Sequence, residues 1–431
     1  MKLFYEWGCI MRKYWILIGS VLITICIVSI YCVKQSARVE VYSKNSENIS
    51  KYPKEEVLSI EKIDNLPQGN HSSSDEYDMD LIGRDLRGAD LSSRSRELMY
   101  SSFNSSTKWP DKLPGEFNPE KIMEDGKNPG LNLRQLHSKG IKGKGIGIAI
   151  IDNPLLVDHI EYKDNIKFYE EIGIVDDVAN FHGGLVSSIA VGKSTGIAPE
   201  ANLYYIAARS MDGDGQSNFK YVAEAIHKIL DINRSLDRKS KIRVISISNG
   251  WIEGQRGYKE ITEAINRAKK EGVFIVSSML IGDYGYFFDG LGREPSKNPD
   301  EVVSFEPSIM YRDYYYNESN IHKFFQNRVA TKFKLNKDVK DILYVPIDSR
   351  AFASPYGKED YIFQRRGGWS SCSPYLAGVY ALVCQAYPQI TPEIFWKIAL
   401  ETGDSITFTK NNKEITMEKV INPLRLIEKL M

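Results

Sequence analysis

From about residue 129 to its end, the chain alternates between short apolar runs and longer stretches whose apolar residues recur with helical spacing. Short runs rich in Val and Ile are typical of strands buried on both faces, as in parallel sheets. Strands are predicted at residues 145–152, 202–207, 244–248, 273–278 and 342–346. Helices are predicted at residues 131–137, 219–230, 260–270 and 391–401, and near residues 182 and 370. This alternation predicts an α/β fold, a parallel central sheet with helices on both faces.

The N-terminal segment contains an uncharged apolar run at residues 15–32, preceded by Arg12 and Lys13. Such a run is close to the minimum length that spans a bilayer. A cleavable signal peptide has the same charged start and apolar core, but no convincing small-residue cleavage site follows this run. We therefore expect residues 1–34 to form a single-pass signal anchor in the cell membrane, with the rest of the chain extracytoplasmic. Cleavage of the segment would instead give a secreted protein.

Two further regions follow this segment. Residues 35–128 are polar, rich in Ser, Asp and Asn, and show little apolar periodicity. They are expected to form a stalk or a poorly ordered region. Residues 129–431 are expected to form the folded body. Within it, an insertion at about residues 281–340 is rich in Tyr and Phe, which favours either a wall of a cleft or simple packing over the sheet.

Composition excludes one class of partner and limits the disulfides. The 431 residues include 56 basic and 56 acidic side chains, so the formal net charge is zero. Without a basic excess or stripe, nucleic acid is not an expected partner. Cys372 and Cys384 lie about 18 Å apart on one predicted helix, too far for a disulfide. A disulfide-free body fits a cytosolic protein, or an exported bacterial protein that does without these bonds.

Ser370 is the first candidate for chemistry. It follows Gly367 and Gly368, and Pro374 lies in the first turn of an almost entirely apolar helix. The unpaired N–H groups at the start of a buried helix favour developing negative charge, which suits a nucleophilic serine with an oxyanion site. A serine-rich helix cap is the alternative.

Two other candidates lie earlier in the chain. Asp152 ends an apolar strand, at the sheet edge where open parallel sheets bind ligands. An Asx turn with Asn153 and Pro154 is the alternative for this residue. His182 is followed by two glycines and opens a predicted helix, which leaves its imidazole free.

Taken in order, these residues resemble the motifs of the subtilisin-like serine peptidases, over roughly residues 131–402. Residues 143–152 resemble the first motif, and His182 with Gly183 matches the start of the second. The spacing from Gly368 through Ser370 to Pro374 resembles the third. The order Asp, His, Ser is the subtilisin order.

The resemblance implies a role for each candidate. Ser370 would be the nucleophile, His182 the general base, and Asp152 the residue that orients the imidazole and stabilises its cation. The backbone N–H of Ser370 would bind the oxyanion. The expected activity is that of a serine endopeptidase that hydrolyses peptide bonds through an acyl-enzyme intermediate.

The sequence also departs from the family pattern. Trp369, Ser371 and Cys372 surround the nucleophile position where the family usually has Thr, Met and Ala. The position of the oxyanion asparagine falls at Ile281, with Ser277 and Ser278 as nearby hydroxyls. Because the loss of one oxyanion donor costs on the order of 10²–10³ in rate, low activity is expected. A catalytically impaired binding or scaffolding module is therefore the alternative function.

The expected partners are a polypeptide substrate and, through the N-terminal segment, a membrane. No cofactor is expected, since no glycine-rich phosphate loop is present. The spacing of the acidic residues matches no dedicated calcium loop, so no metal site is predicted. These residues are Asp176, Asp177, Asp212 and Asp214.

Overall fold

The computed structural model describes residues 48–67, 79–310 and 341–431 except residue 411. The predicted membrane segment at residues 1–34 lies outside the described residues. In the described part of the chain, no helix is both long enough and apolar enough to cross a bilayer.

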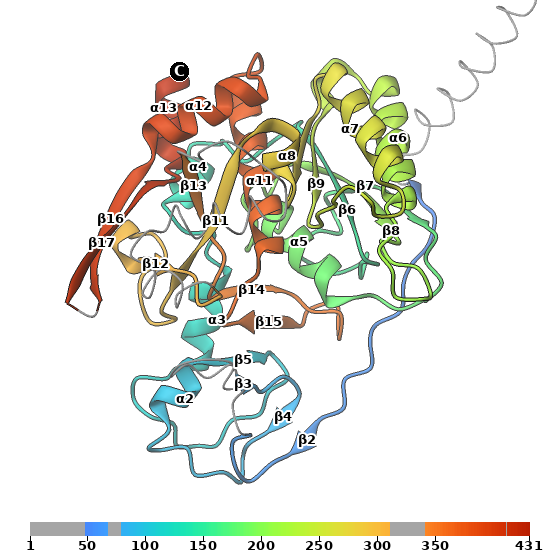
Figure 1. Cartoon of the computed structure of the whole chain (residues 1–431). Coiled ribbons are helices and arrows are strands. Elements are labelled where there is room, and N and C mark those ends of the chain that lie inside the picture. The colour runs from blue at the N-terminus through green and yellow to red at the C-terminus, as the bar shows by residue number, and fades with distance from the viewer. Residues whose placement is uncertain (1–47, 68–78, 311–340, 411) are drawn as a thin grey trace, which may run out of the picture.

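A parallel six-stranded sheet forms the centre of the body (Figure 1). Every neighbouring pair of its strands is parallel. Its central strand β6 is buried along its whole length, as its run of Ile and Ala residues predicts. In spatial order the strands are β1 (Asn48–Ile49), β7 (Ile166–Ile172), β8 (Asn202–Ala208), β6 (Gly147–Asp152), β9 (Ile242–Ile247) and β10 (Phe274–Ser277).

Helices cover both faces of this sheet. Side chains alternate across a strand, so Ile148 and Ile150 of β6 lie in one core cluster and Ala149 and Ile151 in another. The first cluster includes residues of α5 and α11, and the second includes residues of α6 and α7. The predicted α/β fold with helices on both faces is confirmed. The bounds are α5 (Phe181–Val191), α6 (Lys220–Ser235), α7 (Tyr258–Lys270) and α11 (Cys372–Ala386).

A second, five-stranded sheet lies beside the first. The described part of the predicted insertion supplies its strands β11 and β12 and the short helix α8, while the aromatic run at residues 311–316 lies outside the described residues. In order the strands are β12 (Phe305–Pro307), β11 (Phe287–Arg293), β13 (Ile342–Pro346), β17 (Lys413–Val420) and β16 (Asp404–Lys410). The helices near it are α4 (Leu133–Ser138), α8 (Leu280–Tyr284), α12 (Pro392–Thr402) and α13 (Pro423–Leu430).

The expected stalk or poorly ordered region at residues 35–128 is corrected for its described parts: β1 joins the central sheet, β2 pairs with β4, and residues 79–128 fold into a lobe below the body (Figure 1). Aromatic rings build its core: Phe103 lies 5.3 Å from Trp109 and 5.1 Å from Phe363, between ring centroids. The strand β5 of this lobe pairs with β15 of the body. The remaining elements are β2 (Glu61–Lys62), β3 (Met79–Asp80), β4 (Arg84–Asp85), α2 (Ser95–Met99), β5 (Ser101–Asn104), α3 (Pro119–Lys127), β14 (Arg350–Ala353) and β15 (Tyr361–Gln364).

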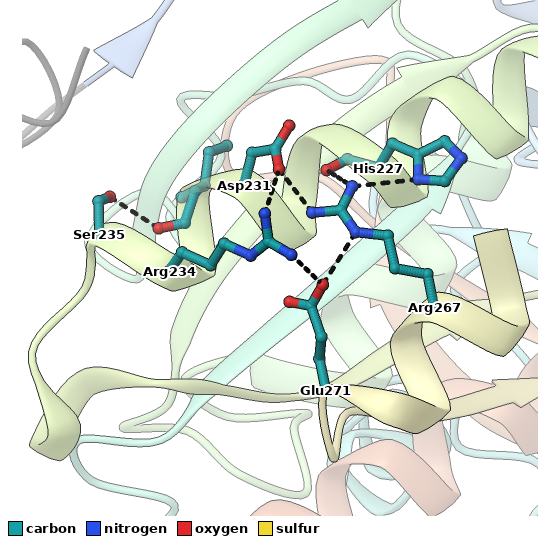
Figure 2. Close-up of polar contacts among 7 residues, drawn as sticks. His227, Asp231, Arg234, Ser235, Arg267 and Glu271 are labelled. Atoms are coloured by element: carbon teal, nitrogen blue, oxygen red, sulfur yellow. Dashed lines mark hydrogen bonds and ion pairs between the residues drawn. The ribbon is translucent and has the colours of Figure 1, made fainter. Parts of the chain in front are cut away.

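On the outer surface, polar side chains join α6 to α7, as Figure 2 shows. Arg267 donates to Asp231 Oδ1 at 2.5 Å and to Glu271 Oε1 at 2.9 Å. Arg234 donates to the same Glu271 oxygen at 2.8 Å. Burial, and then the charge of Arg267, lower the pKa of His227, whose Nδ1 lies 3.1 Å from an Arg267 nitrogen. Arg267 therefore contacts more of this network than Arg234 does.

Replacement of Arg267 by Ala should lower the free energy of unfolding by about 1 kcal/mol, because it removes both carboxylate contacts of a partly buried side chain. The Arg267 side chain is 24% exposed, against 62% for Arg234. Arg234→Ala is the matched control and should have a smaller effect. Urea unfolding of the two variants and the wild type measures the difference. Equal losses would show that the extra contacts of Arg267 contribute nothing.

Candidate active site

Asp152 lies at the carboxyl end of β6, where the structure pairs it with a histidine. Its side chain is 2% exposed, and its Oδ1 lies 2.5 Å from His182 Nδ1. The same oxygen accepts a hydrogen bond from the backbone N–H of Asn153 at 2.8 Å. A short contact of this kind to a buried carboxylate fixes the position of the imidazole and places the N–H on Nδ1.

His182 is the second residue of α5, and two local features place it there. Asn180 caps the helix, since its side-chain oxygen accepts from the backbone N–H of His182 at 2.9 Å. Gly183 lets the helix start approach the chain that follows β6. A Cβ at this position would lie 2.8 Å from the carbonyl oxygens of Asn153 and Pro154, so a larger residue would push His182 away from Asp152.

The electrostatics of the pair favour a charged imidazole. Burial lowers the pKa of His182, but the charge of Asp152 and its hydrogen bond act in the opposite direction, and the net result is a raised pKa. The His182 side chain is 21% exposed, against 2% for Asp152. The imidazole is therefore both stabilised and partly accessible to solvent.

Ser370 lies in the 3-10 turn Trp369–Ser371 (η3), directly before α11. The sequence predicted that this residue opens the helix; the α-helix itself begins at Cys372, one short turn later. The Ser370 carbonyl accepts from the Ser248 hydroxyl at 2.8 Å, and α5 packs against this turn. Ser370 is half-buried. A hydrogen bond between its hydroxyl and His182 stays a prediction.

Ser248 is a residue that the sequence analysis missed as part of this site. In the register of β6 and β9, Ile151 lies opposite Ile247, so Asp152 and Ser248 end neighbouring strands. Asp152, at the end of β6, holds the histidine, and Ser248, directly after β9, holds the turn with Ser370. The position of Ser248 at the end of a predicted strand was the available signal, because parallel strands end at a common edge.

The position aligned with the oxyanion asparagine is apolar in the structure as well. Ile281 lies in the first turn of α8, is 8% exposed and belongs to the main core cluster. The Ser277 hydroxyl is buried and accepts from the backbone N–H of Met279 at 3.0 Å. Ser278 donates its backbone N–H to the carbonyl of Asn249 at 3.2 Å.

Three of the four acidic residues considered for calcium take part in ion pairs. Asp212 and Asp214 each lie 2.9 Å from Arg256, and Asp177 pairs with Lys51 and Lys54. In the described ranges, no cluster of three or more His, Cys, Asp or Glu side chains is placed to hold a metal ion. The two cysteines of α11, Cys372 and Cys384, are free and buried, as predicted.

A hollow of 690 Å³ adjoins the Asp152–His182 pair. Asn153 and Asn180, which flank the pair in sequence, contribute to its wall. The backbone of Lys54 bonds to that of Asp177 at 2.9 Å and of Ala179 at 2.8 Å, so the segment after β1 braces this wall.

Comparison with known proteins adds to this geometry. The family model described as "Subtilase family" matches residues 143–304. A "Subtilisin-like protease 2" of Arthroderma otae is 30% identical over 163 residues, which cover 37% of this chain and 36% of that protein. The "Major intracellular serine protease" of Bacillus subtilis is 25% identical over 173 residues, which cover 36% of this chain and 50% of that protein.

The matched part of the chain, residues 143–304, is a divergent subtilase sequence. The matches span about a third to a half of the length of these relatives. The solved structure of "Prenylagaramide maturation protease PagA" covers 70% of this chain at 15% identity with a TM-score of 0.46. The matched residues 143–304 contain Asp152 and His182, whereas Ser370 lies beyond them. The role of Ser370 therefore depends on its motif and its position in the fold.

Replacement of Asp152 by Asn should lower the pKa of His182 by roughly 1 to 3 pH units, because burial remains and the opposite charge is lost. NMR titration of the His182 ring in both proteins measures this change. His159, whose pKa burial lowers, serves as an internal control and should be unchanged.

Because the pKa of His182 is raised, the contribution of the His182–Asp152 pair to stability decreases as pH rises. The attraction between imidazolium and carboxylate is fully present below the unfolded pKa and is lost as pH rises through the folded one. The stability advantage of the wild type over Asp152→Asn should therefore shrink from pH 5 to pH 9. A constant difference would contradict a charged pair.

Proposed function

We propose that this chain is a serine endopeptidase that uses Asp152, His182 and Ser370. The observation that carries the proposal is the 2.5 Å contact between His182 Nδ1 and Asp152 Oδ1. It leaves Nε2 as the nitrogen available to a nucleophile, and the turn with Ser370 packs against the helix that carries His182. The protease names of the subtilase relatives support the same reaction class.

In the proposed reaction, His182 Nε2 takes the proton of the Ser370 hydroxyl as its Oγ attacks the carbonyl carbon of the peptide. The imidazolium is stabilised by Asp152. The C–N bond then breaks, and His182 gives its proton to the leaving amine. Water, activated by the same imidazole, attacks the acyl-enzyme and releases the acid. The backbone N–H of Ser370 is the proposed donor to the oxyanion.

A second candidate function is a catalytically impaired module that binds or scaffolds a partner. Ile281 favours it, because this buried apolar side chain occupies the position of a family oxyanion donor. If catalysis survives, the missing donor predicts a turnover lower by on the order of 10²–10³ than with a complete oxyanion site.

Labelling by a fluorophosphonate probe tests the proposal. The wild type should be labelled and Ser370→Ala should not, because the probe forms a bond to an activated serine oxygen. Ser371→Ala is the matched control: its hydroxyl is buried without a hydrogen-bond partner in the described residues, so labelling should persist. A folded wild type that remains unlabelled would favour the binding module.

We also propose that residues 1–34 anchor the chain in the cell membrane, with the folded body outside the cytoplasm. The uncharged run at residues 15–32 supports this proposal. The full-length protein should stay with membranes after an alkaline carbonate wash, and a form that begins at residue 35 should be soluble. Recovery of the full-length protein in the soluble fraction would contradict the anchor.

A further inference from the structure

The turn before Ser370 is bonded to two buried acids of the second sheet and of the loop that follows β13. Asp289 of β11 is fully buried and Asp348 is 1% exposed. The backbone N–H of Gly367 donates to Asp348 Oδ1 at 2.8 Å. The indole N–H of Trp369 donates to Asp289 Oδ1 at 2.9 Å. Gly367 and Trp369, on the two sides of Gly368, are thus each hydrogen-bonded to a different carboxylate.

Asp348 is held in place by bonds that do not involve the nucleophile turn. Its Oδ1 also accepts from the Ser308 hydroxyl at 3.1 Å, and its Oδ2 accepts from the backbone N–H of Ile309 at 2.8 Å. Gly367 comes so close to this loop that a Cβ would lie 2.2 Å from the carbonyl oxygen of Ile347. Only glycine fits this approach. The close contact with Ile347 and the hydrogen bond to Asp348 together fix the position of the backbone at the start of the turn.

Asp289 fixes the other side of the turn through a side chain. The Trp369 ring packs against Phe288 at 5.8 Å and Phe287 at 6.3 Å between centroids, and both rings belong to β11. Asp289 Oδ1 also accepts from the backbone N–H of Gly290 at 2.8 Å, which restricts its carboxylate. The indole therefore has both a packing surface and one defined acceptor.

We propose that Asp289 is a positioning residue for the Ser370 nucleophile, acting through Trp369 in a turn whose start is bonded to Asp348 through Gly367. The inference rests on the proposed function of Ser370. Trp369 is adjacent to Ser370, so an indole that is held by both a hydrogen bond and ring packing restricts the backbone of Trp369 and with it the peptide group that carries the Ser370 N–H. The Ser248 hydroxyl, directly after β9 of the first sheet, donates to the Ser370 carbonyl. Three attachments thus define the turn before α11.

The test measures labelling of the full-length protein by a fluorophosphonate, with the maximal rate and the half-saturating probe concentration determined separately. Trp369→Phe keeps a ring against β11 and removes the N–H donor. It should lower the maximal rate about tenfold, on the scale of one lost buried hydrogen bond, and leave the half-saturating concentration unchanged. Asp289→Asn keeps an acceptor oxygen in place and should label within about twofold of the wild type.

Two further variants make the test specific. Asp289→Ala removes the acceptor, and the double variant with Trp369→Phe should label no more slowly than the slower single variant, because both changes break the same bond. Trp396→Phe is the matched control, since Trp396 is a buried tryptophan of α12 stacked on Tyr286. Its labelling should equal that of the wild type. The pH profile of labelling should stay the same in Trp369→Phe, because His182 is untouched.

The outcomes separate this inference from the proposed function. An unlabelled wild type rejects the function of Ser370 and removes the reaction that Asp289 would serve. A labelled wild type with an unchanged maximal rate in Trp369→Phe overturns the positioning role alone. A change confined to the half-saturating concentration would make Trp369 a wall of the binding site and also overturn it. Equal losses of the maximal labelling rate in Asp289→Asn and Trp369→Phe would contradict the role of this hydrogen bond, because Asp289→Asn keeps the acceptor oxygen.

Discussion

The parallel register of β6 and β9 is the constraint on which the candidate site depends. Because Ile151 lies opposite Ile247, the next residues of the two strands, Asp152 and Ser248, emerge side by side at one sheet edge. One of them orients the imidazole and the other holds the carbonyl of Ser370. A shift of this register by one residue would turn one of these side chains to the opposite face of the sheet. The two groups would then no longer meet.

The body also buries several charged side chains. Arg293, Arg350 and Arg365 are each less than 5% exposed. Burial lowers the pKa of Arg350 to about 10, and its guanidinium donates to the carbonyls of Pro129 and Thr195. Burial likewise raises the pKa of Asp348, whose bonds to backbone N–H groups and the charge of Arg365 act against that change. Such groups are tolerated in the interior because they are hydrogen-bonded.

Local signals predicted much of the body. The strand at residues 342–346 has the predicted bounds, and Asp152 and His182 were found because each stands at the boundary of one regular element. The helix expected at residues 131–137 starts later, at Leu133, because Leu131 and Asn132 adopt left-handed φ angles of 50° and 60°. Such a turn depends on the surrounding contacts and leaves no clear trace in the apolar pattern.

Other features could not be predicted, because they depend on contacts between distant residues. The strands of the lobe at residues 79–128 are two to four residues long, too short to show an alternating pattern. Strand β7 was missed because its Lys and Glu residues interrupt the apolar run. The bond between Trp369 and Asp289 joins residues 80 positions apart, and nothing near either residue indicates the other.

The pairing of β5 with β15 has a consequence for the order in which the protein folds. Ser105 and Tyr361, which share a hydrogen bond next to this pairing, are 256 residues apart in the chain. A ribosome must therefore make most of the protein before the early strand meets its partner, and contacts of such long separation form slowly. Until then, Phe103 and its aromatic neighbours lack the Phe363 ring that completes their core. The aromatic core of the lobe is therefore incomplete until the strand that closes it has been made, and that strand precedes Ser370 by only a few residues.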